Sequence, residues 1–150
     1  MIVWACLIGI VAGLRALTPL AAVSWAAHLG WLPVHGTWLS FLGSSITAYV
    51  VTVLAIFELV ADKLPTTPSR KMPPGFGARI VTGALSGAAI ATASGAVWLG
   101  LVLGAVGAVI GTFAGSAMRA QLARAFGKDL PAALLEDAIA VGCAILLIKI

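Results

Sequence analysis

Charged residues are scarce in this sequence. Only 9% of its 150 residues are charged, against roughly 25% in a typical soluble protein, and 61% are hydrophobic. A soluble fold of this length would need polar side chains to coat its surface, whereas nearly every window of about 19 residues here is apolar enough for lipid. The shortage of charge excludes a soluble globular domain. It predicts one transmembrane domain over residues 1–150, an all-α bundle of about five transmembrane helices with a broken first helix.

Cysteine and histidine are scarce as well. Cys6 and Cys143 lie in apolar runs near opposite ends of the chain, without a CxxC spacing or a cluster of histidines. They are expected to be small buried apolar residues, so no metal site and no cofactor are predicted. No hydrolase or redox constellation and no glycine-rich phosphate loop after a strand appears, so no enzyme is predicted.

The net charge of +4 comes from nine Lys and Arg residues, most of them in two short segments. This grouping favours membrane orientation and attraction to anionic lipid headgroups over nucleic-acid binding. The positive-inside rule then predicts that both basic segments and the N-terminus lie in the cytoplasm and that the C-terminus lies outside. The basic residues used are Lys63, Arg70, Lys71, Arg79, Arg119, Arg124 and Lys128.

The apolar runs set the expected helices. The first run, 2–33, is interrupted by Arg15 and by Thr18-Pro19, which predicts a helix over 2–17 and a shorter interfacial or re-entrant piece over 19–29. The proline-rich segment 65–75 is predicted to be a polar loop without helix. The remaining helices are predicted at 39–64, 79–96, 98–118 with a polar continuation to 128, and 131–150. The turn between the third and fourth crossings is expected at 94–100.

Aromatic and histidine residues surround the turn at 28–38, which contains no Lys or Arg. Tryptophan prefers the headgroup level of a bilayer. This cluster therefore predicts a membrane interface, on the side opposite the basic segments. Its members are Trp25, His28, Trp31, His35 and Trp38.

Many of the 17 glycines are spaced four residues apart on predicted helices. Such spacing lets helix backbones approach closely, either inside one bundle or between protomers. We expect at least one glycine-rich face to remain on the outside of the bundle and to support a homo-oligomer. The pairs and ladder are Gly9 and Gly13, Gly83 and Gly87, Gly100 and Gly104, and Gly107, Gly111 and Gly115.

The sequence contains a short self-match. Residues 8–13 read IGIVAG and residues 110–115 read IGTFAG, and an Arg-Ala pair follows each segment, at Arg15-Ala16 and Arg119-Ala120. With three crossings between them, the two copies would point in opposite directions across the membrane. Inverted repeats of this kind recur in transporters, with a site and broken helices at the repeat interface. The acidic residues do not follow the repeat.

Two acidic pairs lie within predicted helices. Glu58 and Asp62 are four residues apart and share a helix face, and Asp62 is expected at the interface. Glu58 lies about one turn deeper among apolar neighbours and should face the bundle interior. Glu136 and Asp137 follow Pro131 closely, where acids either interact with the helix dipole or line a pathway.

Arginines are the expected partners of these acids, because unpaired charge at membrane depth is costly. Three interpretations stay open: a structural salt-bridge network, a proton- or ion-coupled pathway, and a lipid-headgroup site. The predicted transport or substrate-binding residues are Arg15, Glu58, Asp62, Arg79, Arg119, Glu136 and Asp137. A separate cluster could hold a lipid headgroup or phosphate, or form only a polar cytoplasmic turn; it comprises Thr67, Ser69, Arg70 and Lys71.

Several strings carry a family resemblance: ELVADKLP at 58–65, TPSR at 67–70, GARIVTGA at 77–84 and GLRALTP at 13–19. They resemble an uncharacterised family of small bacterial multi-pass inner-membrane proteins, known as domain of unknown function 4126. The similarity covers almost the whole chain. It implies a multi-pass inner-membrane protein and gives no activity.

Two functions follow as hypotheses. The first is a small transporter or channel-like protein for an ion or small solute, with Glu58 in an internal polar pocket sharing charge with Arg15 or Arg79. The second is a non-transporting scaffold or lipid-binding protein whose buried charges are structural salt bridges. A continuous polar cavity would favour the first, and a dry core with each acid capped by an arginine would favour the second.

Overall fold

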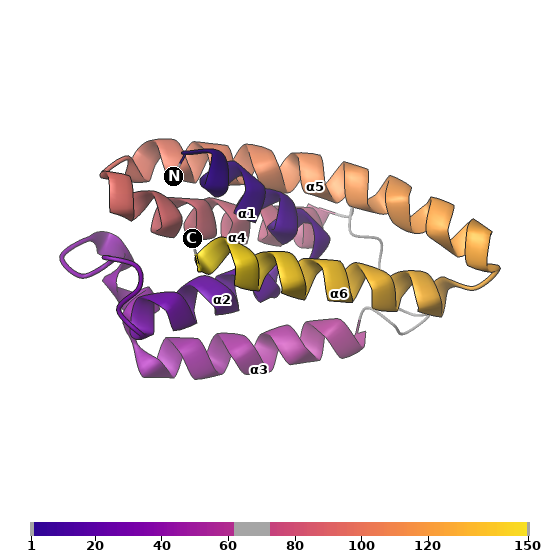
Figure 1. Cartoon of the computed structure of the whole chain (residues 1–150), viewed down its shortest axis with the longest axis horizontal. Helices are drawn as coiled ribbons and strands as arrows, with labels where there is room; N and C mark the ends of the chain where they lie inside the picture. The colour runs from indigo at the N-terminus through magenta and orange to yellow at the C-terminus, as the bar shows by residue number, and fades with distance from the viewer. Residues whose placement is uncertain (1, 62–72, 150) are drawn as a thin grey trace.

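The computed structural model describes residues 2–61 and 73–149, and this part of the chain is helical without a strand (Figure 1). It confirms the predicted all-α fold: a compact bundle with a broken first helix. The elements are α1 (Ile2–Leu14), α2 (Leu17–His28), the 3-10 helix η1 (Trp38–Gly43), α3 (Ser45–Ala61), α4 (Pro73–Ala91), the 3-10 helix η2 (Thr92–Ser94), α5 (Val97–Phe126) and α6 (Asp129–Ile148).

Three segments are long and apolar enough to cross a membrane: Pro74–Ser94, Val97–Phe126 and Asp129–Ile148. Helices α1 and α3 are apolar but shorter. Large apolar side chains are exposed along α3, including Val53 and Phe57 at 66% and 71%. These faces have no cover within the described chain and suit a lipid environment. The structure therefore supports a membrane protein.

Helices α1, α4 and α5 form the closest packed part of the bundle. A Cβ atom added at Gly104 would overlap the carbonyl oxygen of Gly83 on α4, and one added at Gly107 would overlap that of Cys6 on α1. The four-residue glycine spacing thus brings backbones together within one chain. Gly104 and Gly107 therefore do not form an outward glycine face, because their missing side chains make room for α4 and α1.

The same contacts fix the directions of these helices. Gly9 lies against Gly104, and Gly13 against Gly111 and Thr112, so α1 and α5 run in the same direction. The segments 8–13 and 110–115 therefore point the same way. The predicted inversion between the two copies is wrong, because α1 does not complete a crossing before α2 turns back.

Helices α1 and α2 form an antiparallel hairpin rather than one kinked crossing (Figure 1). They contain 13 and 12 residues, or about 20 and 18 Å at 1.5 Å per residue. Neither reaches across a hydrocarbon layer of about 30 Å. Because of this extra reversal, the chain runs along the bundle an even number of times. Both ends of the chain therefore lie at the same end of the bundle (Figure 1).

Several predicted boundaries shift. Helix α4 begins at Pro73, inside the segment expected to lack helix, because a first turn needs no N–H hydrogen bonds and accepts proline. The crossing expected from residue 39 is split, since Ser44 has extended backbone between η1 and α3. The turn after α4 falls at η2 and Gly95, whose φ of +70° favours glycine. Helix α5 runs unbroken to Phe126, and α6 begins at Asp129 rather than at residue 131.

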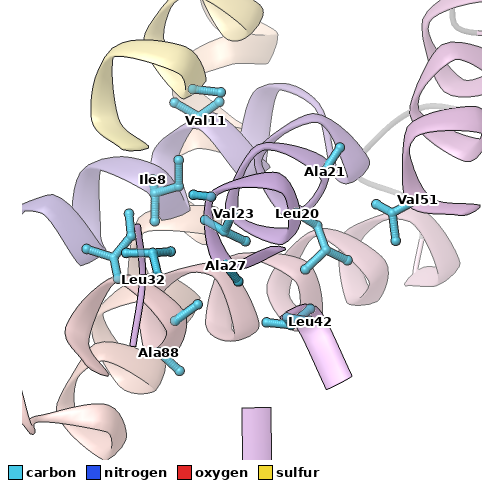
Figure 2. Close-up of a cluster of buried hydrophobic side chains, with 14 of the residues drawn as sticks. Ile8, Val11, Leu20, Ala21, Val23, Ala27, Leu32, Leu42, Val51 and Ala88 are labelled. Atoms are coloured by element: carbon cyan, nitrogen blue, oxygen red, sulfur yellow. The ribbon is translucent and has the colours of Figure 1, made fainter. Parts of the chain in front are cut away.

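The hydrophobic core surrounds α2. Figure 2 shows Val23 and Ala27 of α2 in one cluster with Ile8 of α1 and Ala88 of α4, all of them fully buried. The end of the bundle next to this cluster carries aromatic residues, among them Trp38 and Trp98, whose rings stack at 6.0 Å. Both tryptophans are exposed, as expected for a headgroup-level belt. Apart from Lys149, the charged residues that the structure describes lie toward the opposite end.

Candidate functional site

The candidate site is the charged junction, defined here as the break between α1 and α2 together with the charged side chains that contact it. Helix α1 ends at Leu14, and α2 begins at Leu17. The break is deeply buried: Arg15 is 0% exposed, and Leu14 and Ala16 are each 7% exposed. Helix ends leave backbone N–H and C=O groups without intrahelical partners. In lipid those groups need partners from the protein.

Two arginines donate hydrogen bonds to backbone carbonyl groups at the C-terminal end of α1. The Arg79 Nη1 atom, from α4, donates to the carbonyl oxygen of Gly13 at 2.8 Å, and the Arg15 Nη1 atom donates to that of Leu14 at 3.1 Å. A guanidinium at a helix C-terminus also meets the negative end of the helix dipole. These two buried arginines therefore compensate the end of α1.

A carboxylate accepts hydrogen bonds from backbone N–H groups at the N-terminal end of α2. Glu58 of α3 accepts hydrogen bonds from the backbone N–H groups of Ala16 and Leu17, both at 2.9 Å. Ala16, at the N-cap position, supplies no side-chain cap of its own. Glu58 therefore acts as the cap in its place, and its charge faces the positive end of the α2 dipole.

The expected partner of Glu58 is corrected by this geometry. No ion pair between Glu58 and Arg15 or Arg79 is found among the residues that the structure describes, and the Glu58 side chain is half-buried. Backbone amides at the α2 terminus take the place of the arginine that the sequence suggested. The position of Glu58 deep in an apolar helix did indicate that its carboxylate accepts hydrogen bonds inside the bundle. It could not identify the group that donates them.

An ion-pair network joins α1 to α6. The Arg15 Nε atom donates to Asp137 Oδ1 at 2.6 Å, and its Nη2 atom also contacts Asp137. The same Nη2 atom lies 3.8 Å from Glu136 Oε2, and both of these side chains are fully buried. Arg15 thus bonds to the α1 carbonyl end and to two acids of α6 at once.

Arg119 extends the network to α5. Its Nη1 atom lies 3.6 Å from Glu136 Oε2, and its Nη2 and Nε atoms donate to the two Asp129 oxygens at 2.8 and 3.1 Å. Asp129 is 62% exposed by side chain, whereas Glu136 is 0% exposed. The network therefore runs from the surface of the bundle to its interior.

The helix-dipole interpretation of Glu136 and Asp137 is wrong. Helix α6 begins at Asp129, which is the acid of its first turn. Glu136 and Asp137 lie about two turns farther along, and dipole effects fall off within the first turn. Their contacts with Arg15 and Arg119 account for their position instead.

The structure thus brings together four of the predicted site residues, Arg15, Arg119, Glu136 and Asp137, and places Glu58 and Arg79 at the same helix break. Asp129 was not predicted, because its contact with Arg119 depends on how α5 turns into α6. The other predicted site residues lie outside the described part of the chain; they are Asp62, Thr67, Ser69, Arg70 and Lys71.

The chemistry of the charged junction is ionic. It combines guanidinium and carboxylate groups with the ends of two interrupted helices, a combination that can either bind the helices together or exchange a proton or ion.

Comparison with known proteins identifies the family of the chain but no activity. No curated protein matches the chain, and no solved structure matches it. A family model matches residues 2–150, and the chain therefore belongs to the family described as Domain of unknown function (DUF4126).

Proposed function

We propose that this protein is a small membrane transporter or channel-like protein for an ion or small solute, with its pathway at the charged junction. The observation that carries the proposal is the buried break between α1 and α2, whose two backbone ends face Arg79 and Glu58. Discontinuous helices with their ends turned toward charge are a recurrent design of ion and substrate sites in transporters.

A second candidate function is a non-transporting scaffold or lipid-binding protein. It is favoured by the partners of the buried charges: Arg15 is paired with Asp137 and Glu136, and Glu58 with backbone amides. In that case the ion pairs serve only to hold the α1–α2 hairpin in the bundle. Buried ion pairs alone are weak support for any gain in stability, so flux must decide between the two functions.

The proposed orientation follows the charges. Arg119, Arg124 and Lys128 lie at or near the end of α5, at the charged end of the bundle, which the positive-inside rule places in the cytoplasm of a bacterial inner membrane. Because α1 and α2 form a hairpin, the N-terminus and the C-terminus then both lie outside. This proposal keeps the predicted side of the C-terminus and reverses that of the N-terminus.

Membrane lipids and a second copy of the chain stay predicted partners. The contacts of Gly104 and Gly107 with α4 and α1 remove these faces from any interface between copies. A homo-oligomer would have to use another surface, such as the exposed apolar side of α3. Cross-linking in membranes over a range of protein-to-lipid ratios tests this; monomer alone would contradict it.

The flux experiment uses the full chain in vesicles of phosphatidylethanolamine and phosphatidylglycerol. Proton and monovalent-cation flux is followed with trapped dyes, and neutral-solute entry by osmotic swelling. We expect a flux that Glu58→Gln abolishes while the purified variant stays folded and monodisperse, because glutamine keeps the shape and loses the titratable charge. Lys149→Gln, at the opposite end of the bundle, is the control and should retain flux.

Normal flux through Glu58→Gln would remove Glu58 from the pathway. If the folded wild-type protein shows no proton, cation or solute flux, the transport function is overturned and the scaffold function is favoured. Unfolding of Glu58→Gln would assign the carboxylate a structural role, and Asp137→Asn would then carry the same flux test.

A further inference from the structure

Three hydroxyl groups on α2 and α4 are buried and, within the described residues, accept and donate no hydrogen bond: those of Thr18, Ser24 and Ser86. Ser24 and Ser86 are 0% exposed, and Thr18 is 8% exposed. Buried hydroxyls in native structures normally have partners. Two others in this bundle do, since Thr82 donates to Arg79 O and Thr112 donates to Ala108 O. The three unbonded hydroxyls therefore depart from the usual pattern of native structures.

These groups belong to two neighbouring helices. Helices α2 and α4 are in contact and run in the same direction, away from the charged end (Figure 1). Arg79 marks the start of this path, because its guanidinium reaches Gly13 at the hairpin break. Ser86 lies about two turns beyond Arg79 on α4, and Ser24 about two turns beyond the start of α2, roughly 10 Å in each case. The two serines thus lie at similar depth, and Thr18 lies in the first turn of α2.

The helix segments that carry the serines contain no charged residue. Residues 17–27 of α2 and residues 80–91 of α4 contain no Asp, Glu, Lys or Arg. Val23 and Ala88, which flank the serines in sequence, are fully buried in the hydrophobic cluster (Figure 2). Hydroxyl groups both donate and accept hydrogen bonds, whereas a bare ion in such a place would need compensating charge. The chemistry fits a small neutral molecule that forms hydrogen bonds.

We infer that Ser24 and Ser86 define a polar seam between α2 and α4 that admits water, or a neutral solute of similar size, from the charged junction into the bundle. The inference rests on the proposed transport function and narrows its substrate class. A water molecule with partners on both helices would satisfy the hydroxyls at these depths. The apolar side chains around the seam would then limit entry by size.

Cysteine accessibility tests the seam without measuring transport. In a background with Cys6→Ala and Cys143→Ala, the variants Ser24→Cys and Ser86→Cys are treated in vesicles with a small methanethiosulfonate reagent. Only the thiolate reacts, and it forms where water reaches the sulfur. Ala88→Cys, equally buried on α4 but in the hydrophobic cluster, is the matched control. We expect both serine positions to react at least about tenfold faster than this control.

Reaction rates at both serine positions equal to that of Ala88→Cys would overturn the seam. A second measurement covers variants that fail to fold. In a dry contact, Ser24→Ala and Ser86→Ala should each raise the unfolding midpoint, because an unbonded hydroxyl is removed from the interior. The hydrated seam predicts no rise, so a rise in both variants would also overturn it.

Osmotic swelling separates the two proposals. Ser86→Leu, which fills the seam, should lower the entry rate of water and small neutral solutes at least several-fold if the seam conducts. Reactive cysteines without any solute entry would leave the seam standing and overturn transport of neutral solutes. Solute entry with unreactive cysteines would overturn the seam and leave transport to another route.

Discussion

Two regions hold the bundle together by opposite means. One is the close contact among α1, α4 and α5, and the other is the charged junction between α1 and α2. In the first, glycines bring backbones so close that even a methyl group would overlap a carbonyl oxygen, as at Gly104. In the second, charged side chains from α3 and α4 reach the two ends of an interrupted helix, and an acid of α6 pairs with Arg15 at the break. The first region is sensitive to added atoms, and the second is sensitive to lost charge.

This difference shows how a short chain can build an interior in lipid. Apolar burial gives little preference between protein and lipid tails, so close backbone packing must supply much of the helix association. Where the helix is broken, unsatisfied backbone groups must be bonded by the protein itself. Arg15 belongs to both regions, since it follows directly after the glycine-rich α1 and pairs with α6.

The largest effect is expected at Arg15. Arg15→Met leaves Asp137 and Glu136 buried without their α1 partner, and removal of one member of a buried ion pair costs about 3–5 kcal/mol. Unfolding by SDS in mixed micelles, followed by circular dichroism, measures the loss. Adding Asp137→Leu should recover part of it, because the orphaned charge is removed. If the double variant is less stable than Arg15→Met alone, the pairing account fails.

An added methyl group should break the other region. Gly104→Ala places a Cβ against the Gly83 carbonyl, and overpacking of a rigid site costs about 1–3 kcal/mol. Gly142→Ala on α6 is the matched control, because nothing lies within 4 Å of its Cβ position. The control should be neutral or stabilise α6 by up to about 1 kcal/mol. Equal unfolding midpoints for the two variants would contradict the close-packing account.

A smaller loss is expected at the α2 cap. Glu58→Gln keeps one acceptor oxygen but turns an amide group toward the backbone N–H groups of Ala16 and Leu17. Loss of a helix cap typically costs about 1 kcal/mol. Amide hydrogen exchange should show the change first at the start of α2, ahead of α5. Unchanged protection at Ala16 and Leu17 would show that Glu58 does not hold this end of the helix.

The smallest effect is expected at the surface of the network. Asp129 is 62% exposed, and exposed ion pairs contribute about 0–1 kcal/mol. Asp129→Asn should therefore change the unfolding midpoint much less than Arg15→Met, and added salt should reduce the difference from wild type further. A loss as large as that of Arg15→Met would show that Asp129 controls the buried pairs.

The sequence was sufficient for the helical class, for a break in the first apolar run and for a turn after α4. Each depends on a local property: apolar length, proline chemistry, or glycine next to small polar residues. The bounds differ, because α1 ends at Leu14 rather than at residue 17 and the turn lies at η2 and Gly95 rather than at 94–100. The sequence left the course of α2 open, because Pro19 in a first turn is compatible with an interfacial piece as well as with a re-entrant one. Without the reversal of α2, the direction of α1 relative to α5 was assigned incorrectly.

The charged junction was predictable only in part. Arg15, Glu136 and Asp137 stood out because charge is costly at membrane depth. The role of Glu58 did not, since its partners are backbone amides and carry no sequence signal. A weak signal existed at the break itself, where Arg15-Ala16 provides none of the usual N-cap side chains. A helix start without a cap in an apolar sequence indicates that another element must supply one.

The α1–α2 hairpin itself can be tested by labelling from each side of the membrane. In the background without native cysteines, Ile2→Cys, Trp31→Cys and Arg124→Cys are exposed to an impermeant maleimide from outside and then from inside. The hairpin predicts that Ile2→Cys and Trp31→Cys are labelled from one side and Arg124→Cys from the other. Labelling of Ile2→Cys and Trp31→Cys from opposite sides would show that α1 and α2 cross the membrane as one helix and would contradict the account.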